Sequence, residues 1–105
     1  MSGSIADSAY TIPRAFAVIG AHTANNNLAG AVALTPPAGA NAVLLQAITQ
    51  NVRYTLDNSA PTATVGFQLR SSDPPLIIDI GPGMTIQAIQ ETATAVLQIQ
   101  WGKYI

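Results

Sequence analysis

The sequence predicts an all-β domain: an antiparallel β-sandwich or small β-barrel of the jelly-roll or immunoglobulin-like type. Short runs rich in β-branched and aliphatic residues recur at spacings of roughly 8–12 residues, as in such folds. Clusters of Gly, Pro, Asn and Asp separate these runs. No segment has the apolar period of a convincing amphipathic helix. The 105 residues suit one domain with a single core.

Residues 1–14 are predicted to form an extended N-terminal arm, and residues 15–105 a single β domain. The arm combines Ser, Gly, Asp and Pro with isolated apolar residues and has neither strand nor helix periodicity. Four of its side chains are predicted to contact partner chains: Ile5, Tyr10, Ile12 and Arg14.

The first third of the domain leaves one alternative open. Residues 15–19 form a short apolar run that predicts the first strand, and residues 20–27 are predicted to form a polar loop. Residues 28–34 have strand length, but their alanines suit a helix equally well. A helix within the Ala-rich region 28–48 is therefore an open possibility. Pro36, Pro37 and Gly39 end whatever precedes them.

The later elements are clearer, because β-rich runs alternate with turn formers. Strands are predicted at residues 42–49, 52–56, 66–70, 76–80, 84–89 and 95–101. In the last of these, Leu97, Ile99 and Trp101 alternate with Gln98 and Gln100. Successive side chains of a strand point to opposite faces, so the apolar set is predicted to face the core.

The composition predicts that much of the surface is buried against partner chains. Hydrophobic residues make up 49% of the chain, and only 9% of residues are charged, against about 25% in typical soluble domains. So little charge leaves a small monomer prone to associate, which predicts a homo-oligomer. Neutral amides occupy strand positions where soluble proteins usually place charges, and they can hydrogen-bond across an interface. These residues are Gln46, Gln50, Gln68, Gln87, Gln90, Gln98 and Gln100.

Several classes of function are disfavoured by the same counts. Without cysteine there are no disulfides, zinc–thiolate sites or cysteine nucleophiles. Four scattered basic residues and a net charge of −1 give no field that would bind nucleic acid. The apolar stretches fall well short of the roughly 20 residues that span a bilayer, so no membrane association is expected.

No catalytic, cofactor-binding or metal-binding residues are predicted. His22 is the only histidine, and no nucleophile motif such as Gly-x-Ser-x-Gly accompanies it. The carboxylates Asp57, Asp73, Asp79 and Glu91 lack the spacing of a calcium loop. Asp57 and Asp73 are instead predicted to cap their own turns. The expectation is therefore a protein that is not an enzyme.

Two further groups could belong to a binding site. Tyr54, Trp101 and Tyr104 could form a sugar-stacking platform if they shared an exposed face, although a Trp in an alternating strand is more often a core anchor. Arg53 and Arg70 flank the turn between two predicted strands. They could pair with Asp57 or Asp73 or contact a neighbouring subunit, and Arg is enriched at interface centres.

The segment from Gln50 to Gly66 carries a family resemblance. It reads Gln-Asn-Val-Arg-Tyr, then, from Asp57, Asp-Asn-Ser-Ala-Pro-Thr-Ala-Thr-Val-Gly. It resembles small proteins of tailed-bacteriophage structural modules, which carry a Gln-x-Val-Arg-aromatic strand, an Asp-Gly-x-x-Pro-Thr-Ala turn and a following Gly. Asn58 stands at the usual Gly position, where Asn can also adopt a positive φ. Residues 87–102 are similar to the C-terminal part of the same proteins.

The resemblance implies a virion structural protein that assembles in the host cytoplasm. Within that class, the expectation is a capsid decoration or cement protein that bridges neighbouring major capsid protein subunits. Such proteins commonly occupy threefold sites, which implies a trimer, and they need no cofactor. A neck or tail structural component and a carbohydrate-binding β-sandwich module remain the alternatives.

Overall fold

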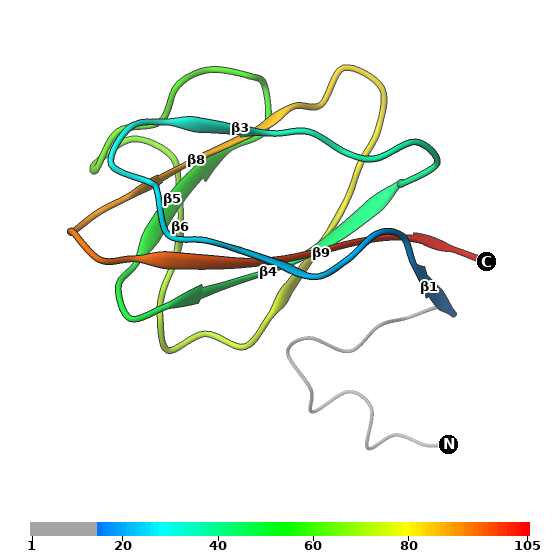
Figure 1. The fold of residues 1–105 in the computed structure, drawn as a ribbon. Helices are drawn as coiled ribbons and strands as arrows, with labels where there is room; N and C mark the ends of the chain where they lie inside the picture. The colour runs from blue at the N-terminus through cyan, green and yellow to red at the C-terminus, as the bar shows by residue number, and fades with distance from the viewer. Residues whose placement is uncertain (1–14) are drawn as a thin grey trace, which may run out of the picture.

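The computed structural model describes residues 15–105, which form nine strands and no helix (Figure 1). The strands are β1 (Phe16–Val18), β2 (Thr23–Asn25), β3 (Val32–Leu34), β4 (Ala42–Ile48), β5 (Val52–Thr55), β6 (Phe67–Leu69), β7 (Leu76–Asp79), β8 (Ile86–Gln90) and β9 (Val96–Tyr104). The open possibility of a helix in region 28–48 is thereby resolved in favour of strands. Ile5, Tyr10, Ile12 and Arg14 lie outside the described residues.

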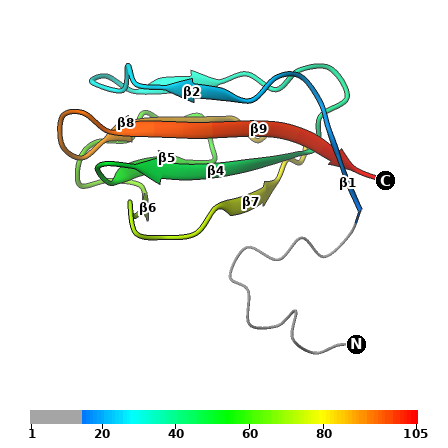
Figure 2. The same cartoon turned by 60° about the horizontal axis from the view of Figure 1, so that its bottom comes forward.

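The strands form two antiparallel sheets that pack face to face (Figures 1 and 2). The five-stranded sheet has the order β1-β9-β4-β7, and β2 also pairs with β9. The four-stranded sheet has the order β3-β8-β5-β6. The prediction of an all-β antiparallel sandwich is confirmed.

The strand order selects one of the two predicted sandwich types. Both β1 and β2 pair with β9, at different points along its length, and β4 occupies its other edge. β1 and β2 therefore act as one interrupted strand along one edge of β9. From β2 onward, successive strands lie in alternate sheets, except that β5 and β6 form a hairpin within one sheet. This is the order of a jelly roll. The immunoglobulin-like alternative, with strands ABED facing CFG, is wrong.

Strand β2 was not predicted, because its sequence carries no strand pattern. Thr23, Ala24 and Asn25 lie in the segment expected to be a polar loop, yet they pair with Ile99, Gln98 and Leu97. Thr23 and Ala24 are exposed at the sheet edge. Pairing with the long β9 strand, rather than burial of apolar side chains, therefore defines this strand.

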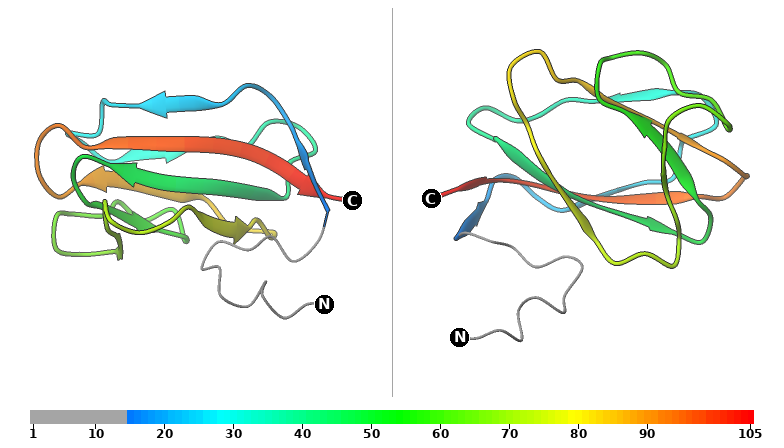
Figure 3. Two further views of the ribbon diagram at one scale, coloured as in Figure 1. Left: turned by 90° about the horizontal axis from the view of Figure 1, so that it is seen from below. Right: turned by 180° about the vertical axis from the view of Figure 1, so that it is seen from behind.

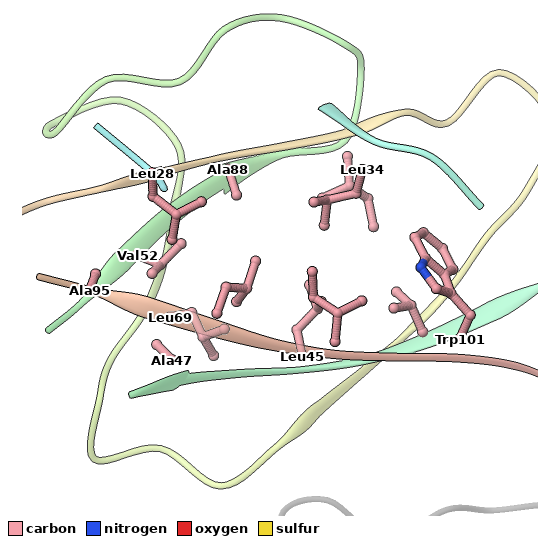
Figure 4. Close-up of a cluster of buried hydrophobic side chains, with 13 residues drawn as sticks. Leu28, Leu34, Leu45, Ala47, Val52, Leu69, Ala88, Ala95 and Trp101 are labelled. Atoms are coloured by element: carbon pink, nitrogen blue, oxygen red, sulfur yellow. The ribbon is translucent and has the colours of Figure 1, made fainter. Parts of the chain in front are cut away.

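The core lies between the sheets and comes from alternate positions of the strands (Figure 4). Leu97, Ile99 and Trp101 are buried, which confirms the predicted core face of β9. Across the β4–β9 ladder they face Ala47, Leu45 and Val43. The four-stranded sheet contributes five buried apolar side chains to the same cluster: Leu34, Val52, Leu69, Ile86 and Ala88.

Hydrogen bonds within the chain hold the loop between β5 and β6. Asn58 has a φ of 69°, a left-handed backbone conformation that Asn tolerates better than most residues. The Asp57 carboxylate accepts hydrogen bonds from the Ser59 amide (3.1 Å) and hydroxyl (2.5 Å). These bonds, the hydroxyl first, lower the pKa of Asp57 and keep it ionised. Gly66 has a φ of 128°, and a Cβ there would lie 3.0 Å from the Tyr54 carbonyl oxygen.

Candidate interaction surfaces

The outer face of the five-stranded sheet is the solvent side of β1, β2, β9, β4 and β7. Its members occupy every second position of these strands, on the side away from the core, and face one another across the ladders. They are Phe16, Val18, Ala24, Ala42, Leu44, Gln46, Ile48, Ile77, Asp79, Val96, Gln98, Gln100, Gly102 and Tyr104. Two of them, Ala42 and Gly102, are buried. Figure 2 shows these strands side by side along the length of the domain.

This outer face carries very little charge. Among its described residues only Asp79 belongs to a charged residue type, and it lies on β7 at the edge of the sheet. The face exposes apolar side chains instead, with Val18 67% and Ile48 37% exposed. A soluble sheet usually places charged or polar residues on its solvent side, so this face has the composition of a protein interface.

Glutamines supply most of the polar groups of this face. Gln98 lies opposite Gln46 on β4, and its Oε1 is 2.5 Å from His22 Nε2. The Gln100 amide donates to the Gly20 carbonyl oxygen (3.2 Å). The Gln46 amide has no hydrogen bond to another described residue. Within residues 15–105 it therefore leaves a donor and an acceptor unpaired near the middle of the face. The hydrogen-bond partner of the His22 ring is thus the Gln98 side-chain amide of β9, and not a nucleophilic side chain.

The outer face of the four-stranded sheet has the opposite character. Glu91 Oε2 accepts bonds from Arg53 Nε (2.5 Å) and Gln68 Nε2 (2.8 Å). Arg53 also donates to the Gly66 carbonyl oxygen (2.9 Å), which fixes the end of the β5–β6 loop. Gln87 donates to the carbonyl oxygen (2.8 Å) and side chain (3.0 Å) of Asn58. The polar groups on this side are thus engaged within the chain, and they brace the loop.

The two predicted interface arginines have different partners. Arg53 pairs with Glu91, and not with Asp57 or Asp73, the two carboxylates considered as possible partners of the arginines. The register of β5 with β8 places Arg53 opposite Ile89 and so near Glu91, a proximity that the sequence spacing does not reveal. Arg70 does pair with Asp73 (3.4 Å), and its side chain stays 63% exposed. The Asp73 carboxylate also accepts from the Arg70 amide (3.0 Å), as expected of a turn-capping residue.

Acid should weaken the fold through Glu91. The Gln68 hydrogen bond, followed by those of Arg53 and Asn51, lowers the pKa of Glu91 from its ordinary 4.5. The unfolded chain then binds the proton more readily than the folded chain does, so the stabilisation is complete above pH 4.5 and is lost as the pH falls through the folded pKa.

We expect Glu91→Gln to lower the free energy of unfolding at pH 7 and to flatten its dependence on pH below 4.5. Urea unfolding at a series of pH values measures both effects. Gln68→Ala is the matched variant, because it keeps the carboxylate and should move its titration toward the ordinary value. An acid profile unchanged by Glu91→Gln would show that the network contributes nothing to acid stability.

An apolar groove of about 480 Å³ opens at the end of β5, beside the edge strand β6. Its apolar lining comes from Tyr54, Leu56, Val65 and Phe67. The Tyr54 and Phe67 rings lie 5.6 Å apart, and burial raises the pKa of the Tyr54 hydroxyl. Val65 and Phe67 are 58% and 61% exposed. Asp57 also lines the groove. We call this feature the β6 groove.

The sequence pattern gives no sign of the β6 groove. Phe67 shares a face of the hairpin with Tyr54 and with the buried Leu69, so alternation alone places it with the core. It remains exposed because β6 is the last strand of its sheet. The exposure follows from the edge position, which depends on the strand order.

The three aromatic residues weighed as a sugar-stacking platform do not share an exposed face. Trp101 is buried between the sheets, and Tyr104 lies on the opposite side of the same strand. Tyr54 belongs to the other sheet, where its ring contacts Phe67. The condition for that platform is therefore not met.

Across residues 15–105, no group of three or more His, Cys, Asp or Glu residues could hold a metal ion. No helix long and apolar enough to cross a membrane occurs in the same range. No family model, curated protein or solved structure matches the chain.

Proposed function

We propose that this protein is a bacteriophage virion structural protein, and specifically a capsid decoration or cement protein that bridges neighbouring major capsid subunits. In this proposal the protein performs no chemical step and binds no cofactor. It stabilises the head by burying the outer face of its five-stranded sheet against partner chains. The observation that carries the proposal is the nearly charge-free composition of that face.

Three features support a structural role in an assembly. The outer face offers apolar side chains and neutral amides, which are less costly to desolvate than charges. The four-stranded sheet is braced on its own outer side by the Arg53–Glu91 network, which gives a rigid body to dock. The jelly-roll order is frequent in viral capsid domains, although it also occurs in lectins and enzymes, so the fold alone does not decide the function.

The proposal includes a homo-oligomer, and a trimer is the form that suits a threefold capsid site. The low charge of the chain supports self-association, because few charges remain to keep exposed apolar groups apart. A cyclic trimer would leave three copies of the outer face available to surrounding capsid subunits.

A charge placed on the outer face should prevent binding to the particle. We expect Gln46→Lys to weaken binding to purified heads of the encoding phage by about tenfold or more, since an unpaired buried charge is costly. The side chain of Gln46 has no described partner to lose, so the fold should tolerate the change. Co-sedimentation of labelled protein with the heads measures the binding.

Ala33→Lys is the matched control, because Ala33 is exposed on the outer face of the other sheet. It should bind as the unmodified protein does. Equal loss in both variants would mean that charge itself, and not the outer face, governs binding. If the unmodified protein fails to bind heads but sediments with tails, the neck or tail alternative replaces the cement role.

A further inference from the structure

We propose that the β6 groove of one copy binds the N-terminal arm of a second copy, with Tyr10 and Ile12 in the groove and Arg14 beside Asp57. The inference rests on the homo-oligomer in the proposed function and names the contact that builds it. It does not depend on the identity of the larger particle. Its occupant is a segment of this same chain, residues 10–14.

The chemistry of the groove matches that segment. Tyr54, Leu56, Val65 and Phe67 form an apolar wall, and two of these side chains are more than half exposed. Apolar side chains of an incoming segment would bury this surface. Tyr10, Ile12 and Arg14 are spaced two residues apart, so in an extended segment they point to the same side. Pro13 favours an extended backbone at Ile12.

The charges of groove and segment are also complementary. Asp57 lines the groove, and the Ser59 bonds hold its carboxylate in place and lower its pKa. Arg14 is the only charged residue between Asp7 and Arg53. In the proposed contact Arg14, which follows the apolar residues Tyr10 and Ile12, therefore lies next to the negatively charged Asp57 of the apolar groove. The outer edge of β6 pairs with no other described strand, so it can also accept an extended segment.

The position of the groove favours a second copy over the same chain. The domain begins at Ala15, whose carbonyl oxygen accepts from the Ile105 amide (3.0 Å) beside the C-terminus. The loop between β5 and β6 lies toward the other end of the sandwich from β1 (Figures 1, 2 and 3). Strand β1 runs antiparallel to β9, so the chain enters β1 from the end where β9 finishes. An arm leaving this end meets the groove of a neighbour in a head-to-tail contact, which can close into a ring.

Single cysteines can test this contact, because the native chain contains none. Full-length Ile12→Cys protein is mixed with full-length Val65→Cys protein and oxidised with copper phenanthroline. We expect the mixed disulfide dimer to form at least about tenfold faster than with Ile48→Cys as partner, because a bound arm raises the local thiol concentration. Ile48 is an exposed apolar residue away from the groove, on the five-stranded sheet.

The charge contact has its own readout in the same assay. Arg14→Gln in the Ile12→Cys chain and Asp57→Asn in the Val65→Cys chain should each slow cross-linking about two- to fivefold, as expected of an exposed ion pair. Combining them should slow it no further than either alone. Asn can keep the turn, since its side-chain oxygen can also accept from Ser59.

Two results would overturn the inference. One is equal cross-linking of Ile12→Cys with Val65→Cys and Ile48→Cys. The other is an intramolecular disulfide in a dilute chain carrying both Ile12→Cys and Val65→Cys, which would place the arm in its own groove. If the cross-linking result contradicts the arm contact, the proposal that the outer face binds heads still stands. If Gln46→Lys does not weaken head binding, the cross-linking prediction still stands. The two proposals can therefore fail separately.

Discussion

Replacing Trp101 with Ala is expected to lower the free energy of unfolding by about 3–5 kcal/mol, the usual range for a large buried aromatic residue. Its side chain is 9% exposed and lies between the sheets (Figure 4). It faces Val43 across the β4–β9 ladder, so truncation would leave a cavity next to the central strands. Urea unfolding followed by far-ultraviolet circular dichroism measures the loss, because the variant lacks the only tryptophan of the chain.

Trp101→Phe is the matched control, since it retains an aromatic ring in the core and should cost clearly less. An unchanged unfolding free energy for Trp101→Ala would contradict the core role. If that variant instead kept its stability and lost glycan binding, the residue would act in a binding site and the structural proposal would lose its basis.

Gly102→Ala is expected to destabilise the protein by about 1–3 kcal/mol, as overpacking usually does, and to displace β1 from the sheet. A Cβ at Gly102 would lie 2.7 Å from the Ala17 carbonyl oxygen and closer still to the Phe16 ring. The Phe16 ring also meets Tyr104 edge to face, with centroids 6.1 Å apart. Only a residue without a side chain lets this ring cover the strand.

Hydrogen exchange gives the local readout for Gly102→Ala. The Ile19 and Ile105 amides, which bond to the Trp101 and Ala15 carbonyl oxygens, should exchange faster in the variant. Gly30→Ala is the control, because a Cβ there has no atom within 4 Å. Unchanged protection of both amides would show that β1 does not depend on the close approach at Gly102.

Local sequence patterns predicted most of the fold, because the strands that build the core carry their own periodicity. Leu97, Ile99 and Trp101 illustrate this, since alternation alone assigned them correctly to the buried face. The Asp57–Ser59 turn was equally local, because the side chain bonds within two residues of itself. In contrast, β2 depends on a partner strand more than 70 residues away in sequence, so its own three residues give no signal.

The candidate surfaces were harder to predict, because they depend on how the sheets are assembled. The abundance of glutamine indicated an interface, but only the register places Gln46 opposite Gln98 on one nearly uncharged face. Likewise, the pairing of Arg53 with Glu91 brings together residues from β5 and the end of β8. The exposure of Phe67 depends on the edge position of β6.

An electron-microscopy map of heads purified from the encoding phage tests the central claim most directly. The proposal predicts density for this jelly roll on the capsid, with the outer face of its five-stranded sheet against major capsid subunits and Gln46 within the contact. Heads that lack this density would contradict the cement role. A bound domain with that face fully open to solvent would contradict the assignment of the binding surface.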